Sequence, residues 1–449
     1  MGRSQPLARE LKPQDLQDLV AGCLLEAEKE GASQAEADAS LSSGLSVTVR
    51  MGEVETLESQ RDRCLGITVF FGQQKGSAST TDLGSGAVAD TVRKACSIAR
   101  FTSSDPYSGL ADAALMAAEF PELDLYHPWN LPAAEAIDLA TRCEAAALTA
   151  DQRIENSEGA TVSSSEGVAV YGNSHGFMGV KRGTSHSASC VIVAKQGQEM
   201  QRDYWYTSAR DPGELMDLEA LGKKAAQRAL ARLGSRKLDT REAQVLFPAE
   251  LARSLLGHLV AAVRGTAQYR KASYLCDAIG QQVLATGINV FERPHLKKAV
   301  GSTAFDSEGV ATTDRDLASD GVLQGYVLNS YTARKLGMTT TANGGGVHNL
   351  ELEAGLASPQ ELMEQMGSGL LLTELIGQGV NILTGDYSRG AAGFWVENGK
   401  IQYPVHEITI AGNLAAMLTG IVAVGNDLDV RSGIRTPSLL LSEMTIAGN

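Results

Sequence analysis

The sequence predicts an α+β protein of two domains: an N-terminal α/β domain (residues 1–235) with an antiparallel sheet flanked by helices, and a mainly-β C-terminal domain (residues 236–449). Two observations carry this division. Helix-like and strand-like stretches follow the same order twice in the first half, whereas the second half consists mostly of short strand-like stretches between glycine-rich turns. A chain of 449 residues also exceeds the usual size of one hydrophobic core.

The first half begins with an amphipathic helix that ends at Gly31, because six apolar residues recur there with helical spacing: Leu16, Leu19, Val20, Cys23, Leu24 and Ala27. Four strand-like stretches follow, separated by turns at Met51-Gly52, Asp62-Arg63 and 72–75. This spacing is typical of an antiparallel meander. Residues 87–101 then form a second helix.

The same order recurs from residue 132 to residue 233. Pro132 is expected at the first position of a helix, strand-like residues 153–209 follow with a turn at 196–198, and residues 215–233 form a closing helix. The repeated order predicts internal pseudo-symmetry in the N-terminal domain. The polar segment 234–241 breaks the apolar periodicity and is expected to be the domain boundary.

The C-terminal half has helix-like stretches at 249–264 and 359–366. Asn398-Gly399 lies between two strand-like runs and predicts a β-hairpin, because both residues tolerate positive φ. Before it, a glycine-rich loop at 385–393 is expected to leave main-chain groups open, so that an extended peptide binds along the edge of 394–396. A side chain added at Gly393 would then block the peptide without unfolding the protein. A bulged sheet corner is the structural alternative.

Two stretches near the C-terminus are almost identical. Residues 407–413 read Glu-Ile-Thr-Ile-Ala-Gly-Asn, and residues 443–449 repeat them with one change. Because no third copy exists, two paired strands of one sheet are expected rather than a repeat array.

Composition excludes several classes of function. A net charge of −14 with scattered Lys and Arg residues argues against nucleic acid as a ligand. The six isolated cysteines indicate reduced thiols and a cytoplasmic location. The N-terminus lacks a signal-peptide pattern, and no apolar run reaches membrane-spanning length, so no membrane association is expected.

Three motifs resemble catalytic or cofactor sites. Gly172-Asn-Ser-His-Gly176 matches a nucleophile elbow, but residues 177–193 look extended instead of helical, which favours a hairpin turn around Ser174. The stretch 84–89 matches a dinucleotide-binding pattern, but the polar stretch before it favours a plain helix entry. The triplet 344–346 lacks the Lys-Ser/Thr of a phosphate loop. No histidine has a second one three to five residues away, so the sequence offers no zinc site.

The segments 384–400, 407–413 and 424–427 closely resemble the PmbA (TldE) branch of the TldD/PmbA peptidase family, and the likeness includes 75–82, 172–176 and 269–271. The resemblance implies a heteromeric zinc metallopeptidase that cleaves unfolded or linear peptides, including precursors of modified peptide antibiotics. The catalytic TldD branch carries His-Glu-x-x-x-His on a helix and a cysteine near the C-terminus.

Alignment on Arg270-Lys271 places Gly257, His258 and Ala262 at the His, Glu and His positions of that motif. The cysteine loop would fall at 433–437, but the last cysteine is Cys276. The resemblance therefore implies no catalytic residue and no metal ligand in this chain. Zinc is expected in a TldD-like catalytic partner, without which this subunit would be inactive.

Five residues are expected to contact the partner or the peptide: Arg270, Lys271, Asp386, Arg389 and Trp395. Self-association of the chain purified alone stays open. Two other functions stay open as well. One is a self-sufficient hydrolase, either a metallopeptidase with scattered ligands or a serine enzyme through Ser174. The other is a regulatory binding protein for DNA gyrase or toxin–antitoxin pairs, as the family's older naming suggests.

Overall fold

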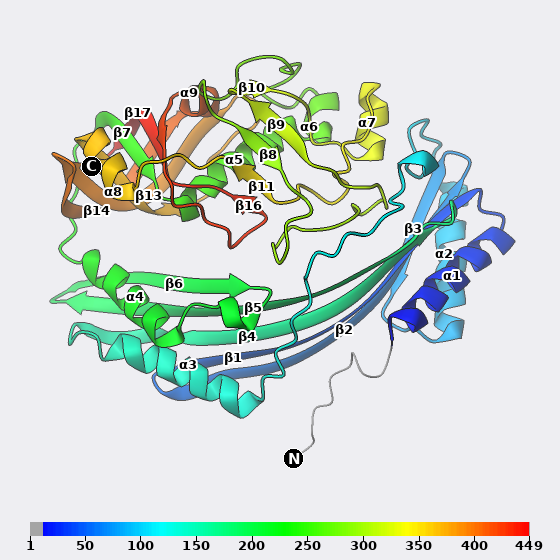
Figure 1. Cartoon of the computed structure of the whole chain (residues 1–449), viewed down its shortest axis with the longest axis horizontal. Helices are drawn as coiled ribbons and strands as arrows, with labels where there is room; N and C mark the ends of the chain where they lie inside the picture. The colour runs from blue at the N-terminus through cyan, green and yellow to red at the C-terminus, as the bar shows by residue number, and fades with distance from the viewer. Residues whose placement is uncertain (1–11, 449) are drawn as a thin grey trace.

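The N-terminal half is built on one curved antiparallel sheet with strand order β3-β2-β1-β4-β5-β6 (Figure 1). The computed structural model describes residues 12–448. The strands of this sheet are β1 (Gln34–Arg50), β2 (Glu53–Phe71), β3 (Gln74–Thr80), β4 (Ile154–Asn173), β5 (Met178–Gln196) and β6 (Glu199–Ala209).

Four helices cover one face of this sheet in two pairs. They are α1 (Pro13–Lys29), α2 (Ser85–Phe101), α3 (Ala133–Leu148) and α4 (Leu218–Ala231). Alternate residues of β1, from Ala35 to Leu41, join α1 and α2 in one core, and Val47 and Val49 join α3 and α4 in another. This period of two leaves the opposite face of the sheet polar, with hydroxyl pairs such as Ser46–Ser163.

The strand order confirms the repeated helix–strands–helix pattern. The first unit contributes β3-β2-β1 and the second β4-β5-β6, so the order is mirrored across the antiparallel β1–β4 pair. The predicted turn at Asp62-Arg63 is wrong, because both residues lie inside β2 opposite Ser42 and Leu41. Residues 53–63 are exposed, which explains how charged residues stay within a strand and look like a turn. Pro132 is the N-cap of α3, one residue before the expected position.

A long connection, here called the strap (residues 102–132), joins α2 to α3. It contains a short 3-10 helix at Ala113–Leu115 and crosses in front of the sheet in Figure 1. Arg334 holds one end of the strap, because its guanidinium donates to the carbonyls of Tyr107 and Gly109 at 3.0 Å. Further along, the amide of Thr184 on β5 donates to Leu125 O at 3.0 Å.

The C-terminal half contains a closed sheet. Its strand order is β14-β13-β12-β7-β17-β15, and an additional β14–β17 pairing joins the ends of the first five strands. The strands are β7 (Arg241–Phe247), β12 (Gly369–Ile376), β13 (Asp386–Glu397), β14 (Lys400–Asn413), β15 (Ile421–Val424) and β17 (Leu439–Ala447). The β14–β17 pairing places Ile410 opposite Ile446, which confirms that the two near-identical stretches are paired strands. Asn449 lies outside the described residues.

A second, smaller sheet of order β10-β9-β8-β11-β16 lies beside this barrel. It consists of β8 (Val290–Glu292), β9 (Arg315–Ser319), β10 (Val322–Leu323), β11 (Leu350–Leu352) and β16 (Ile434–Arg435). The helices of this half are α5 (Ala249–Val263), α6 (Gly265–Tyr269), α7 (Ser330–Leu336), α8 (Pro359–Met366) and α9 (Leu414–Thr419). The predicted helices at 249–264 and 359–366 are confirmed.

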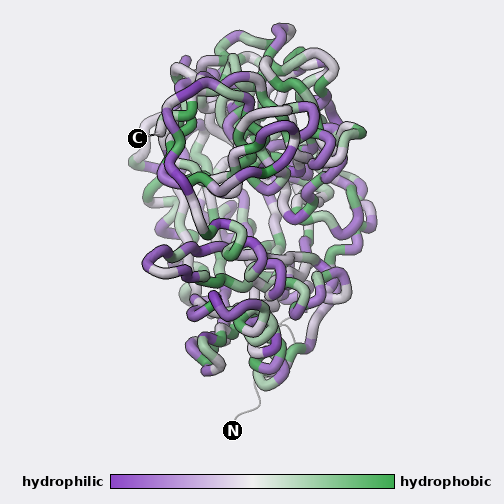
Figure 2. Tube along the Cα trace, turned by 90° about the vertical axis from the view of Figure 1, so that its left-hand side faces the viewer, coloured by the Kyte–Doolittle hydropathy of each residue, from purple (hydrophilic) through white to green (hydrophobic). Residues whose placement is uncertain are grey.

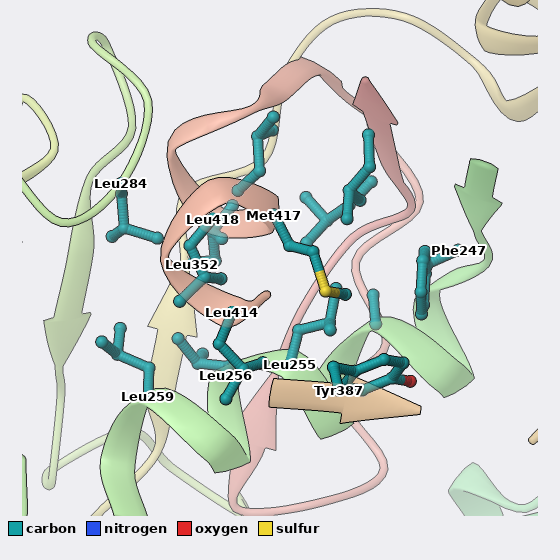
Figure 3. Close-up of a cluster of buried hydrophobic side chains, with 14 of the residues drawn as sticks. Phe247, Leu255, Leu256, Leu259, Leu284, Leu352, Tyr387, Leu414, Met417 and Leu418 are labelled. Carbon is teal, nitrogen blue, oxygen red and sulfur yellow. The ribbon is translucent and has the colours of Figure 1, made fainter. Parts of the chain in front are cut away.

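The largest core surrounds α5. Figure 3 shows Leu255, Leu256 and Leu259 of this helix gathered with Leu414 of α9 and Tyr387 of β13, and all five are at most 2% exposed. The turned view in Figure 2 shows the two lobes, with hydrophilic and hydrophobic residues mixed along each. In residues 12–448, no helix combines the length and apolar character needed to span a bilayer.

Candidate functional site

Helix α5 carries the positions where the family resemblance would place zinc ligands. Gly257 has no side chain, and a Cβ placed on it would lie 4.0 Å from the Cδ1 of Ile434 on β16. Ala262 is fully buried in the core around the helix. The segment expected to match the cysteine loop therefore contributes an isoleucine beside Gly257. Within residues 12–448, no cluster of three or more His, Cys, Asp or Glu side chains could hold a metal ion. These residues do not fit zinc.

His258, at the glutamate position of the motif, belongs to a buried polar group. Its ring lies 6.0 Å from that of Tyr387, edge to face. His258 Nε2, the Tyr387 hydroxyl and Arg389 Nε have no hydrogen-bond partner among the described residues. Burial, and then the Arg389 guanidinium, lower the pKa of His258, so the imidazole is neutral near pH 7. A neutral imidazole can accept a proton, but Gly257 and Ala262 beside it supply no ligand for a metal whose bound water it would activate.

A cavity of about 860 Å³ lies elsewhere, between the two halves of the chain. Its walls come from β1, β4 and β5, from residues 120–126 of the strap, and from residues 300–307, 344–345 and 347–348 of the C-terminal half. A volume of this size is typical of sites for small ligands or short peptide segments. Gly344 and Gly345 of the glycine triplet contribute to this wall.

Two charged groups with shifted pKa values line the cavity. The Lys181 ammonium lies 4.3 Å from the centre of the Phe305 ring and donates to Phe305 O at 2.8 Å. The surrounding protein removes water from this ammonium and lowers the pKa of Lys181 to about 8. Burial raises the pKa of Asp306 to about 6, although the carboxylate accepts bonds from the amides of Glu308, Val310 and Gly344.

A buried network fixes the C-terminal wall of the cavity. Glu292 of β8 is 2% exposed and accepts hydrogen bonds from Asn343 Nδ2 at 3.0 Å, from the His348 amide at 2.7 Å and from Arg315 Nε. Arg315 also donates to Tyr326 O at 2.9 Å. Sequence reasoning missed Lys181, Asp306 and Glu292, because segments far apart in the chain meet only in the folded protein. The one local signal is a lysine that directly follows small and apolar residues in a strand.

The residues expected to contact a partner or a peptide do not form one site. Arg270 and Lys271 follow α6 and are exposed; the Arg270 guanidinium lies over the Tyr269 ring, and Lys271 Nζ pairs with Asp277 at 2.8 Å. Asp386 begins β13 and accepts a hydrogen bond from Thr384 Oγ1. Arg389 is half-buried and donates to Leu375 O at 3.4 Å. Their contact roles stay predictions.

Trp395 lies far from Asp386, near the other end of β13. It is 6% exposed, its Nε1 donates to Glu397 Oε1 at 2.9 Å, and the Arg241 guanidinium lies 4.9 Å from its ring centre. These contacts anchor the ring within the protein, beside a smaller cavity lined by Arg241, Gln244 and Trp395.

The expected open edge at 394–396 is wrong, and so is the loop at 385–393. Strand β13 begins at Asp386 and is paired on both sides; Phe394, for example, lies between Leu371 of β12 and Pro404 of β14. The small residues at 390–393 allow close packing of these strands and expose no main chain to a ligand. The hairpin itself is confirmed: Asn398 and Gly399 have φ values of 51° and 71° in the turn between β13 and β14.

Ser174 lies in the turn between β4 and β5, as the hairpin alternative predicts. Its Oγ accepts a hydrogen bond from the Ala35 amide at 3.1 Å, and its amide donates to Ala35 O at 2.8 Å. His175 Nε2 lies 3.2 Å from Ala111 O and does not contact Ser174 Oγ. No helix follows the serine, because β5 begins at Met178. Gly84 likewise is the N-cap of α2, a plain helix entry.

Ser174→Ala is therefore expected to leave any peptidase activity of the protein within about threefold of wild type, because only the hydrogen bond from the Ala35 amide to the serine hydroxyl is lost. Steady-state cleavage of an unfolded peptide measures this. Removal of a true serine nucleophile costs roughly a thousandfold or more, and a loss of that size would restore the serine-hydrolase reading.

Comparison with known proteins agrees with this architecture. Residues 240–448 match the PmbA/TldA metallopeptidase C-terminal domain, residues 126–233 the central domain and residues 35–99 domain 1. The chain is 51% identical to the metalloprotease PmbA of Escherichia coli O157:H7 over 92% of each chain. It is 46% identical to the PmbA homologue of Haemophilus influenzae over 97% of each.

A solved structure from Bacteroides thetaiotaomicron has the same fold. That protein, described as a candidate modulator of DNA gyrase, is 28% identical and superposes with a TM-score of 0.93, covering 98% of this chain and all of its own. The identity to PmbA proteins over nearly the whole chain confirms the resemblance found in the sequence. The chain therefore belongs to the PmbA branch of the PmbA/TldD family of metallopeptidases.

Proposed function

We propose that this chain is the non-catalytic subunit of a heteromeric zinc metallopeptidase. A TldD-like partner holds the zinc, and the pair cleaves unfolded or linear peptides. The observation that carries the proposal is the state of α5, where Gly257 and Ala262 supply no ligand atom and Ile434 fills the space beside Gly257. The helix keeps its packing face while its metal chemistry is gone, as in a subunit retained for its shape.

The cavity of about 860 Å³ supports a role in holding peptide. It is lined by strand backbone and by the Lys181 ammonium, and contains no ligand set for a metal among the described residues. In this role the chain provides part of the wall of the chamber in which the partner cleaves its substrate. Main-chain groups on that wall would hold peptides of many sequences, since every peptide offers the same backbone donors and acceptors.

The test is a comparison of each subunit alone with the pair. The purified chain is expected to hold far less than one zinc per molecule by elemental analysis and to leave an unfolded peptide uncut. Mixed with a TldD-like subunit it is expected to give cleavage that a chelator abolishes. Stoichiometric zinc in this chain alone, together with chelator-sensitive cleavage, would contradict the proposal and favour the self-sufficient metallopeptidase.

A further inference from the structure

Strand β5 has a short open edge inside the cavity. Strand β6 pairs with β5 only from His186 onward, so residues 178–185 have a strand neighbour, β4, on one side only. In an antiparallel ladder the main-chain groups of alternate residues point to opposite sides. Thr184 points away from β4, since its amide bonds Leu125 O and its carbonyl accepts from Arg210 at 2.8 Å. Val180 and Arg182 must point the same way.

Thr184 uses both of its outward groups, but no hydrogen bond from a described residue reaches the outward amide or carbonyl of Val180 or Arg182. Both residues line the cavity. Native proteins pair nearly all buried main-chain groups, or else expose them to water or a ligand. These four groups are therefore available to whatever enters the cavity.

The strap would close this edge if it continued alongside β5, but it turns away. It bonds β5 at Leu125, and the preceding Asp124 has a φ of 55°, in the left-handed region. Leu123 then bonds Lys298 of the C-terminal half instead, its carbonyl accepting from that amide at 2.9 Å. The diversion leaves a gap between the strap and β5, and this gap is part of the cavity.

The side chains of Val180, Lys181 and Arg182 do not cover the main-chain groups of the open edge. The Arg182 guanidinium lies 3.4 Å from the centre of the Tyr126 ring, and Val180 packs against the core shared with α1 and α2. Lys181 projects from the other face toward Phe305. The edge thus presents main chain, with one ammonium beside it.

We propose, building on the proposed function, that the open edge of Val180 and Arg182 binds the main chain of an extended peptide substrate as an added antiparallel or parallel strand. An edge of residues 179–183 spans about 16 Å, enough for about five peptide residues at roughly 3.3 Å each. Recognition is through the backbone and is largely independent of peptide sequence, and Lys181 favours a peptide with a carboxylate nearby. The site thus lies on β5, while the edge expected from the sequence on β13 is closed.

The first test replaces the outward amide. Val180→Pro removes one donor at a strand edge, where proline is tolerated, and keeps the β4 ladder. Binding of a fluorescein-labelled unfolded decapeptide of alanine, threonine and valine, followed by fluorescence anisotropy, is expected to weaken about tenfold through loss of a main-chain hydrogen bond and obstruction by the ring.

The matched control is Ser59→Pro. Ser59 of β2 lies opposite Leu45 of β1. The main-chain groups of Leu45 face β4, so the amide and carbonyl of Ser59 point away from β1 and out of the sheet, as those of Val180 do. Its edge is outside the cavity, because no residue of β2 is among the cavity walls. This variant is expected to bind the peptide like wild type. Unchanged binding by a Val180→Pro variant that melts like wild type would overturn the inference, as would equal weakening by both variants.

A second measurement needs no variant. In a second form of the same peptide, every second amide nitrogen is methylated, so that one edge of the extended peptide has no N–H group to donate. This form is expected to bind the wild-type chain at least about tenfold more weakly. Equal binding of the two peptides, or no binding of either at millimolar concentration, would refute the proposed edge site even if Val180→Pro failed to fold. Cleavage by the pair with the TldD-like subunit, measured in parallel, separates this outcome from a failure of the proposed function.

Discussion

Gly393→Ala is expected to destabilise the protein severely, by at least about 3 kcal/mol. A Cβ at this position would lie 2.2 Å from Leu371 O, a main-chain atom of the neighbouring strand. Insertions into a packed core cost about 1–3 kcal/mol where side chains can move, and here β13 is paired on both sides, so the backbone cannot move without breaking a ladder. Urea unfolding followed by circular dichroism measures the loss.

Gly390→Ala provides the matched control on the same strand. Its Cβ would lie 3.3 Å from Ile376 Cβ, so Ile376, the exposed last residue of β12, has to give by only a few tenths of an ångström, and the expected cost is about 1 kcal/mol. A Gly393→Ala protein as stable as Gly390→Ala would show that the main chain at 393 is open, as the sequence alone suggested.

Glu292→Ala is expected to cost about 3–5 kcal/mol, since it leaves the Arg315 guanidinium buried without its carboxylate. The variant also removes the acceptor for Asn343 and His348, which hold the wall of the cavity. Peptide binding should therefore weaken together with stability. Denaturant unfolding gives the first effect, and anisotropy with the labelled decapeptide gives the second.

Asp138→Ala removes a comparable ion pair from the surface and serves as the control. On α3, Arg142 Nε lies 3.0 Å from Asp138 Oδ2, and the side chains of Asp138 and Arg142 are 66% and 52% exposed. Loss of such an exposed pair changes the free energy of unfolding by less than about 1 kcal/mol. Replacing both charged partners, as in Glu292→Met with Arg315→Leu, should recover the part of the lost stability that comes from the unpaired guanidinium, while Asn343 and His348 still lack their acceptor. A single Glu292→Ala variant as mild as Asp138→Ala would show that this network does not support the wall.

Helices and turns were the most predictable features, because their signals are local. The apolar spacing from Leu16 to Ala27 identified α1, and Asn398-Gly399 identified the hairpin, since a tight turn depends on the φ values of two residues. Strand extent was less predictable. Asp62 and Arg63 look like a turn, yet pairing with β1 carries the strand through them.

In the candidate site, too, the features set by local sequence were predictable and those set by distant contacts were not. The sequence determined the absence of a zinc motif on α5 and the family likeness, since both depend only on which residues follow one another. Which strand edge is open depends on neighbours from distant parts of the chain. A run of small residues on β13 reads as exposed main chain, but β12 and β14 cover it on both sides.

On β5, nothing in the sequence from Met178 to Gly183 indicates an open strand edge. That edge exists because β6 pairs only from His186 onward and because the strap turns away at Asp124. The sequence by itself therefore determined the family, most helices and the absence of a His-Glu-x-x-x-His motif from α5. Only the tertiary structure decided where main chain meets open space, because hydrogen-bond partners across a sheet are chosen by three-dimensional packing and not by neighbours in the chain.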